Sequence, residues 1–166
     1  MKTPASIMIA MVLFLTTTVA QTIKGTYAIK NVQTGMLLRI KDANTKTGTP
    51  IVLYEPQNWK CMTWDFKHID GNTYQLENLF SGKTMQASGT KEGSNFDEQP
   101  IEQAKASQLY DFEPAGKNIF LIKLKGTEQY ITPAGEGAGV NSLVKLAPRR
   151  GDKSQQWTIY QQSPTM

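Results

Sequence analysis

The side chains best suited to catalysis or metal binding are few in this sequence. It contains one histidine, His68, and one cysteine, Cys61. A zinc site of the usual kind needs three or four His or Cys ligands at characteristic spacings, and this pair does not supply them. No serine stands in a nucleophile-elbow sequence, and no glycine-rich loop has the spacing of a phosphate cradle. We therefore expect no metal and no cofactor, with His68 a surface strand residue.

Carboxylates offer the remaining route to catalysis. The chain has 14 Asp and Glu residues, which is enough for the acid–base pair of a glycosidase. Such a pair needs a defined separation across a cleft, and none of these residues lies in a recognisable catalytic motif. We therefore expect that the protein is not an enzyme.

Cys61 has two interpretations. A single cysteine leaves no internal disulfide framework. It is then either a buried small apolar residue or a reactive thiol that could form an intermolecular bridge. No histidine or other base lies near it in sequence, which favours the buried residue.

A small basic cluster lies near the end of the chain, where Arg149, Arg150 and Lys153 surround Asp152. The formal net charge is only +4. A cluster of this size is more typical of a solvated turn than of a nucleic-acid site. We expect no nucleic-acid partner.

Residues 1–20 differ in kind from the rest. Lys2 supplies a positive start, an apolar run extends from Ile7 to Leu15, and Thr18-Val19-Ala20 resembles a cleavage site. This pattern predicts a secretory signal peptide cut before Gln21. The alternative is a membrane anchor, but the run is short for a bilayer and no stop-transfer charges follow. We expect a secreted protein, periplasmic if bacterial, with no membrane span after cleavage and one domain over residues 21–166.

The mature chain is organised around an aromatic triplet that occurs three times. The copies begin at residues 64, 110 and 157, which are 46 and 47 positions apart. In a strand, residues i and i+2 point to the same face, so each copy places two bulky apolar groups on one face. They predict one core with threefold internal symmetry. The triplets are Trp64-Asp65-Phe66, Tyr110-Asp111-Phe112 and Trp157-Thr158-Ile159.

Each of these triplets, called an anchor below, lies in the last strand of a unit of four short strands. The opening strands alternate apolar and polar residues, and the glycines Gly35, Gly82 and Gly126 follow them as tight turns. Nowhere does a long apolar stripe of period 3.6 indicate a helix. The predicted opening strands are 27–31, 74–78 and 120–124, the second strands 37–40, 84–87 and 129–132, and the third strands 50–54, 100–104 and 143–147.

The sequence therefore predicts about twelve strands and no helices. The edge strands of such a sheet would leave backbone N–H and C=O groups unpaired. Closure into a barrel pairs these groups, with the opening and anchor strands forming the barrel and the middle strands forming capping hairpins. This predicts an all-β protein, a β-trefoil of three pseudo-symmetric four-stranded repeats. The repeats cover about 24–70, 71–116 and 117–162.

Three motifs carry a family resemblance. Gln155-Gln156-Trp157 and Gln108-Leu109-Tyr110 give a Gln-x-aromatic ending, Tyr27-x-Ile29-x-Asn31 precedes Gly35, and Gly48 to Val52 leads into a third strand. Together they resemble the ricin-type (ricin B-like) lectin domain, over roughly Thr26 to Gln161. The resemblance implies a β-trefoil that binds carbohydrate.

In that family each sugar site has three parts within one unit. A carboxylate on the second strand accepts hydrogen bonds from two hydroxyls, an aromatic ring at the end of the third strand stacks on the C–H face, and polar groups in or near the Gln-x-Trp motif complete the contacts. No unit here has all three. The matched residues are Arg39, Gln86 and Thr132 for the acid, Tyr54, Ala104 and Leu146 for the aromatic, and Met62, Gln108 and Gln155 for the glutamine.

The resemblance therefore implies a non-standard site in the first unit. Its predicted carbohydrate-binding residues are Tyr54, Arg39, Asn58 and Trp59. Arg39 donates hydrogen bonds but cannot accept them, which favours an anionic sugar or carboxylate. Alternatively, Tyr54 and Trp59 cover the underside of the barrel. Weaker candidates for sugar contact are Gln86, Gln108 and Gln155, of which the last two have the alternative role of satisfying buried backbone groups.

Two functions remain open. The first is a secreted lectin-like protein whose partner is a glycan or glycoconjugate, favoured by the repeat pattern with Tyr54 and Trp59. The second is a protein-binding β-trefoil, inhibitor-like or adhesin-like, whose partner is a secreted or cell-surface protein. The missing carboxylate in all three units favours the second.

Overall fold

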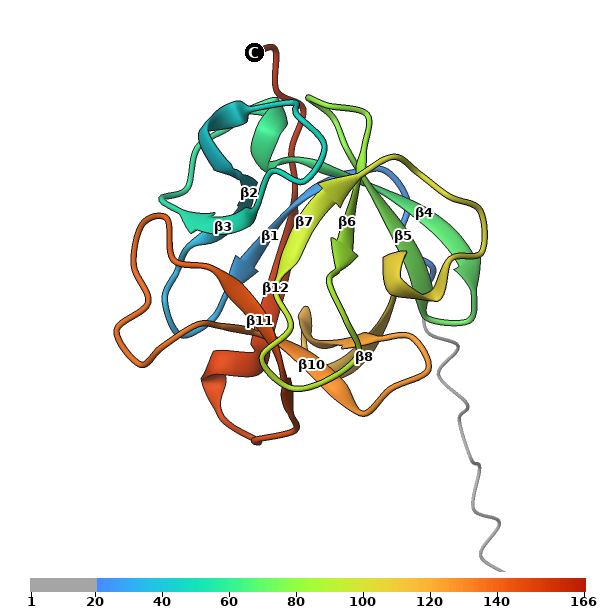
Figure 1. The fold of residues 1–166 in the computed structure, drawn as a ribbon, viewed down its shortest axis with the longest axis vertical. Coiled ribbons are helices and arrows are strands. Elements are labelled where there is room, and N and C mark those ends of the chain that lie inside the picture. Colours follow the sequence, from blue (N-terminus) through green and yellow to red (C-terminus); the bar gives the residue numbers. More distant parts are fainter. Residues whose placement is uncertain (1–20) are drawn as a thin grey trace, which may run out of the picture.

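A computed structural model describes residues 21–166, and the predicted signal peptide lies outside these residues. The described chain forms twelve strands in one antiparallel arrangement (Figure 1). The strands are β1 (Thr26–Asn31), β2 (Leu37–Ile40), β3 (Ile51–Tyr54), β4 (Trp64–Asp70), β5 (Thr73–Asn78), β6 (Thr84–Ala87), β7 (Phe96–Gln99), β8 (Leu109–Gly116), β9 (Ile119–Leu124), β10 (Gln129–Pro133), β11 (Val144–Pro148) and β12 (Gln156–Gln161).

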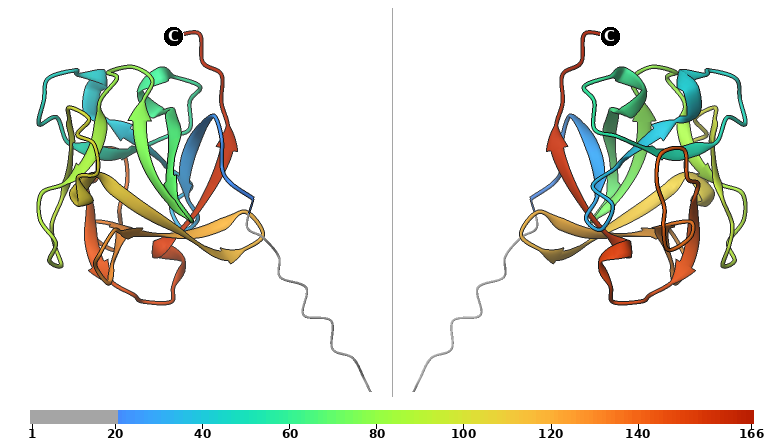
Figure 2. Two further views of the ribbon diagram at one scale, coloured as in Figure 1. Left: turned by 90° about the vertical axis from the view of Figure 1, so that its right-hand side faces the viewer. Right: turned by 90° about the vertical axis from the view of Figure 1, so that its left-hand side faces the viewer.

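Six of these strands close a barrel. Each of β1, β4, β5, β8, β9 and β12 pairs with two neighbours in a ring that returns to its start. The other six form the hairpins β2–β3, β6–β7 and β10–β11, which gather at one side of the molecule (Figure 2). Opening and anchor strands thus build the barrel and middle strands cap it, as the repeat pattern predicts.

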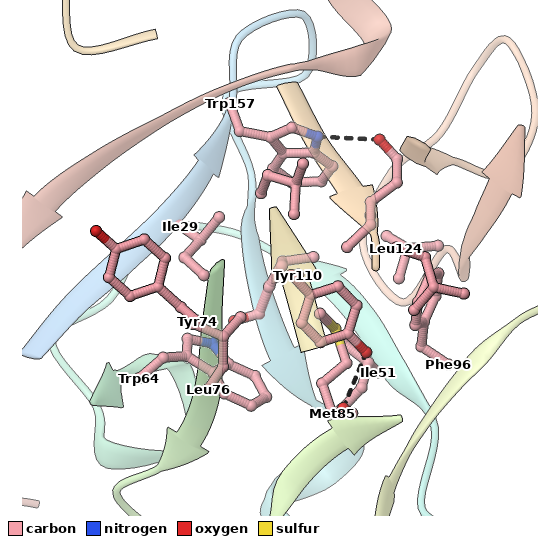
Figure 3. Close-up of a cluster of buried hydrophobic side chains, with 14 of the residues drawn as sticks. Ile29, Ile51, Trp64, Tyr74, Leu76, Met85, Phe96, Tyr110, Leu124 and Trp157 are labelled. Carbon is pink, nitrogen blue, oxygen red and sulfur yellow. Dashed lines mark hydrogen bonds between the residues drawn. The ribbon is translucent and has the colours of Figure 1, made fainter. Parts of the chain in front are cut away.

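The anchor residues tie the barrel to the hairpins. Trp64 and Trp157 are fully buried. Their indole Nε1 atoms donate to the carbonyls of Leu38 at 3.2 Å and Ile131 at 3.0 Å. In the second unit the Tyr110 hydroxyl donates to the carbonyl of Met85 at 2.9 Å (Figure 3). These equivalent bonds align the three units residue by residue.

The three hairpins are joined in a cycle through their backbones. The Leu53 amide of the first unit donates to Ser142 of the third at 2.9 Å. The Glu98 amide of the second unit donates to Thr49 of the first at 2.9 Å. The Leu146 amide of the third donates to Ser94 of the second at 2.8 Å. Each unit therefore satisfies backbone groups of the next, as expected if no unit folds alone.

The third strand of the second unit was predicted in the wrong place. Pro100-Ile101 resembles Pro50-Ile51 of the first unit, which suggested a strand over 100–104. The structure instead forms β7 over Phe96–Gln99, with Phe96 buried and Ile101 41% exposed. Phe96 rather than Ile101 occupies the core position, because burial of its larger apolar ring contributes more free energy to folding.

The expectation of no helices is also wrong, though only for single turns. Within residues 21–166 there are four three-residue 3₁₀ helices, and sequences this short carry no apolar stripe. They are η1 (Lys41–Ala43), η2 (Lys60–Met62), η3 (Ala106–Gln108) and η4 (Lys153–Gln155). The last three lie just before the anchor strands, one in each unit.

Three further features concern single residues and the membrane. Cys61 is buried and free, which agrees with its interpretation as a small apolar residue. His68 is exposed on β4, as predicted. Between residues 21 and 166 no helix is long and apolar enough to cross a membrane.

Candidate functional site

The structure brings three of the four first-unit candidates together. The guanidinium carbon of Arg39 lies 4.0 Å from the centre of the Tyr54 ring. The Tyr54 and Trp59 ring centres are 6.1 Å apart, with their planes tilted by 35°. Both rings are partly buried, whereas Asn58 is exposed in the loop before Trp59. These residues form a small cluster on β2, β3 and the following loop.

Arg39 supports this cluster from inside. The residue is only 8% exposed and its guanidinium stacks on Tyr54. Its Nε has no hydrogen-bond partner, and its nearest acid, Asp42, is 3.9 Å away. A guanidinium held this way offers little surface to a carboxylate from solvent. The geometry therefore gives Arg39 a cation–π contact beneath Tyr54.

Gln108 is fully buried and all its polar groups are used within the protein. Its Oε1 accepts from the Glu102 amide at 2.9 Å and from Gln75 at 2.8 Å. Its Nε2 donates to the Pro100 carbonyl at 2.8 Å and to Gln86 at 3.0 Å. These bonds hold the loop between β7 and η3 and engage both Gln108 and Gln86, two of the weaker candidates.

Gln155 holds the corresponding loop of the third unit. It is fully buried, accepts from the Arg150 amide at 2.7 Å and donates to the Pro148 carbonyl at 2.8 Å. The structural alternative for Gln108 and Gln155 thus has hydrogen bonds to support it. Neither buried amide is free for a ligand in this arrangement.

The first unit performs the same task with a residue that sequence reasoning missed. Met62 replaces the motif glutamine there. Gln162, just after β12, donates to the Gln57 carbonyl at 2.9 Å and accepts from the Thr63 hydroxyl at 2.7 Å. It lies 99 positions from Thr63, so no local motif could have identified it.

The structural alignment corrects two predicted equivalences. Ala104 lies in a turn with φ of 57°, outside any strand. Leu146 pairs across from Ile131 and so corresponds to Leu53, which pairs across from Leu38. The counterparts of Tyr54 are instead Gln99 and Ala147, because each follows its unit's inner residue by one position. Only the first unit has an aromatic ring at this place.

A polar pocket of about 520 Å³ opens in the third unit. It includes Thr132, the residue matched to the family's acidic position, and Lys145, its direct partner on β11. Sequence reasoning named Thr132 and noticed the basic cluster, but missed the residues that complete the lining. The pocket is lined by Gln33, Thr132, Pro133, Gly135, Glu136, Lys145, Arg150, Asp152 and Ser154.

Charges of both signs surround this pocket. Asp152 accepts from the Ser154 amide at 2.9 Å and also from the Ser154 hydroxyl. These hydrogen bonds, with a smaller contribution from Arg150, lower the pKa of Asp152. Two carboxylates, Glu136 and Asp152, and two cations, Lys145 and Arg150, line one cavity. Such a set can accept from and donate to paired hydroxyl groups.

Metal binding has no support in the described part of the chain. Residues 21–166 contain no group of three or more His, Cys, Asp or Glu residues placed to hold a metal ion. The pocket of the third unit has two carboxylates and no histidine.

Comparison with known families identifies the architecture. The model of the ricin-type β-trefoil lectin domain-like family matches residues 16–104 and 57–146, which together span most of the 166 residues. The chain belongs to the ricin-type β-trefoil lectin family. No curated protein sequence matches it.

Solved structures agree with the ricin-type fold. The agglutinin of Rhizoctonia solani has a TM-score of 0.74 and 22% identity, covering 84% of this chain and 96% of its own. The ricin B-like lectin of Macrolepiota procera, solved in complex with lactose, has a TM-score of 0.68 and 22% identity, covering 84% and 98%. A designed threefold symmetric protein, ThreeFoil, has a TM-score of 0.79 and 17% identity, covering 82% and 99%. At these identities the similarity concerns the β-trefoil fold.

Proposed function

We propose that this ricin-type protein binds carbohydrate through the polar pocket of the third unit. The observation that carries the proposal is the lining of that pocket. Two carboxylates and two cations, all from one unit, surround a cavity of about 520 Å³ at the place where Thr132 matches the family's acidic position. Pockets of about 300–1,000 Å³ are typical of small-molecule sites.

The carboxylates in this pocket come from different positions than the family pattern expects. Thr132 on β10 cannot replace an acid as a strong acceptor. Glu136, four residues later, and Asp152, before η4, supply carboxylates within the same lining. The hydrogen bonds from Ser154 lower the pKa of Asp152, so its carboxylate is ionised over a wider pH range and can accept hydrogen bonds from sugar hydroxyls.

The cations define the other half of the proposed site. Lys145 is partly buried, and Arg150 is exposed at the pocket. Both donate hydrogen bonds to hydroxyl or carboxylate oxygens. No aromatic residue lines this pocket. We therefore propose recognition by hydrogen bonds more than by stacking, with a saccharide that presents several hydroxyls to the lining.

Similar structures support a glycan ligand. The Macrolepiota procera lectin was solved with lactose, and a Polyporus squamosus lectin with a sialylated trisaccharide. The earthworm R-type lectin C-half was solved with GalNAc. We further propose that residues 1–20 direct secretion and that residues 21–166 act as one lectin-like, non-enzymatic domain.

A glycan array on residues 21–166, followed by calorimetry with the best ligand, tests the proposal. Arg150→Ala and Glu136→Gln should each weaken binding by about tenfold, the loss of one charge-assisted hydrogen bond. Tyr54→Ala serves as the control, since it lies in the first unit, and should bind as wild type. Loss of binding in Tyr54→Ala with retention in both third-unit variants would move the site to the first unit.

A protein ligand is the alternative function. No second-strand position matched to the family's acid carries a carboxylate, since these residues are Arg39, Gln86 and Thr132. Absence of any glycan ligand, together with saturable binding to one identified secreted or cell-surface protein, would favour this alternative.

A further inference from the structure

A second pocket, of about 230 Å³, opens in the first unit and has the opposite character. Its lining comes from η1, the loop and turn around η2, the β5–β6 turn and the last described residue. Apart from Lys60 these side chains are apolar or weakly polar. The pocket is lined by Ala43, Trp59, Lys60, Cys61, Phe80 and Met166.

The two pockets occupy equivalent places in their units. Trp59 and Asp152 each lie five residues before the anchor tryptophan of their unit, and Cys61 and Ser154 each lie three residues before it. The anchors correspond because both bond the equivalent hairpin carbonyl. Asp152 and Ser154 line the third-unit pocket, whereas Trp59 and Cys61 line the first-unit pocket.

The remaining walls correspond in the same way. Ala43 follows Leu38 by five residues and Glu136 follows Ile131 by five. The amides of Phe80 and Gln33 each donate to the asparagine two positions earlier, at 3.0 and 3.2 Å. Four polar lining residues of one pocket, Gln33, Glu136, Asp152 and Ser154, are thus replaced in the other by Phe80, Ala43, Trp59 and Cys61.

The apolar walls lie outside the main barrel core, although Cys61 belongs to a small buried cluster against which Ala43 and Trp59 pack. Phe80 is 43% exposed and Trp59 is only partly buried. Core packing alone would bury such rings, because an exposed ring forfeits the free energy of burial. An apolar cavity of about 150 Å³ is enough to bind benzene. The first-unit pocket therefore has room for one substituted ring or a short alkyl chain.

We propose that the first-unit pocket binds the aromatic ring or short alkyl chain of a small amphiphile. Trp59 and Phe80 contact the apolar part, and Lys60 is the one charged residue in the lining, which favours an anionic head group. This site is separate from the proposed glycan site in residues and in ligand chemistry. Its presence does not depend on whether a glycan binds to the third unit.

Trp59 provides a direct measurement. Trp64 and Trp157 are fully buried in the barrel, so a ligand in this pocket contacts only the third tryptophan. Titration of residues 21–166 with 4-phenylbutyrate should give a saturable change in tryptophan emission, with matching heat in calorimetry. Phe80→Gln, which introduces the third-unit residue type, should weaken binding by about tenfold.

Two controls separate this site from the glycan site and from misfolding. Arg150→Ala should bind 4-phenylbutyrate as wild type. Trp59→Phe should lose the emission change but keep the calorimetric heat, because a ring still lines the pocket. Thermal unfolding monitored by circular dichroism verifies that each variant is folded.

Two results would overturn the proposal. The first is the absence of heat and of emission change with both 4-phenylbutyrate and octanoate at millimolar concentration. The second is a Trp59 emission that depends on protein concentration, with a dimer in sedimentation that Phe80→Gln abolishes, since the apolar walls would then be covered by a second copy.

Discussion

The first and third units place a pocket at the same point of the fold but line it with opposite chemistry. In both, an anchor tryptophan bonds a hairpin carbonyl and fixes where the pocket lies. Most lining residues are exposed or partly buried, the buried ones being Cys61, Thr132 and Pro133, and none of them takes part in that bond. Trp59 in one unit and Asp152 in the other therefore change the chemistry of the pocket while the barrel stays the same. The scaffold and the pocket lining reside in different residues.

The two units also hold their loops differently. Gln155 binds the third-unit loop from within its own unit. In the first unit the apolar Met62 occupies the position of the motif glutamine and cannot make these hydrogen bonds. Gln162, just after β12, makes hydrogen bonds to the first-unit loop instead. Substitution of the motif glutamine is thus tolerated because a distant residue satisfies the same loop.

The largest expected effect tests the shared scaffold. Trp64→Ala and Trp157→Ala should each lower the free energy of unfolding by about 3–5 kcal/mol, because each removes a fully buried ring. Urea denaturation followed by far-ultraviolet circular dichroism measures the change. If one variant were as stable as wild type, the two units would not share the same structural anchor.

The next effect tests the hydrogen bonds by which Gln162 and Gln155 hold the loops of the first and third units. Gln162→Ala and Gln155→Ala should each cost about 1–3 kcal/mol, since each removes two hydrogen bonds that hold a loop. Gln161→Ala is the matched control, because Gln161 is exposed and should change stability by less than about 0.5 kcal/mol. A Gln162→Ala variant no less stable than this control would contradict the proposed replacement of the motif glutamine.

The second unit sharpens the comparison through Glu98. Its counterparts are Leu53 and Leu146, yet Glu98 is fully buried and neither carboxylate oxygen has a hydrogen-bond partner. Burial raises the pKa of Glu98, and nearby Ser81 and Lys83 lower it only in part. Asp97 beside it also raises the pKa. A glutamate at this position should therefore destabilise the folded state when it is ionised.

Glu98→Leu should raise the free energy of unfolding at pH 7 by about 1–2 kcal/mol. Because the folded pKa is raised, the folded state binds the proton more tightly than the unfolded state. Wild-type stability should therefore fall as the pH rises from the unfolded pKa, about 4.3, through the folded pKa. Glu98→Leu should lose this part of the pH dependence. An unchanged pH profile would show that Glu98 does not carry the penalty.

The repeat and the strands follow from the sequence alone. Alternation and the spacing of the anchors are local or periodic signals, and closure of twelve short strands leaves few architectures. The prediction of the third strand in the second unit was wrong because Pro100-Ile101 resembles Pro50-Ile51 at the start of β3. Only packing in the folded core distinguishes the exposed Ile101 from the buried Phe96.

The sites divide in the same way. Tyr54 and Trp59 are five residues apart, and the sequence assigned both to one predicted first-unit site, where their rings lie 6.1 Å apart. The burial of Arg39 beneath Tyr54 could not be predicted, because accessibility depends on every neighbouring element. The third-unit pocket joins Gln33 of the first unit to Asp152, residues more than a hundred positions apart. Such a lining exists only once the barrel has closed, since closure brings the turn of one unit against the 3₁₀ helix of another.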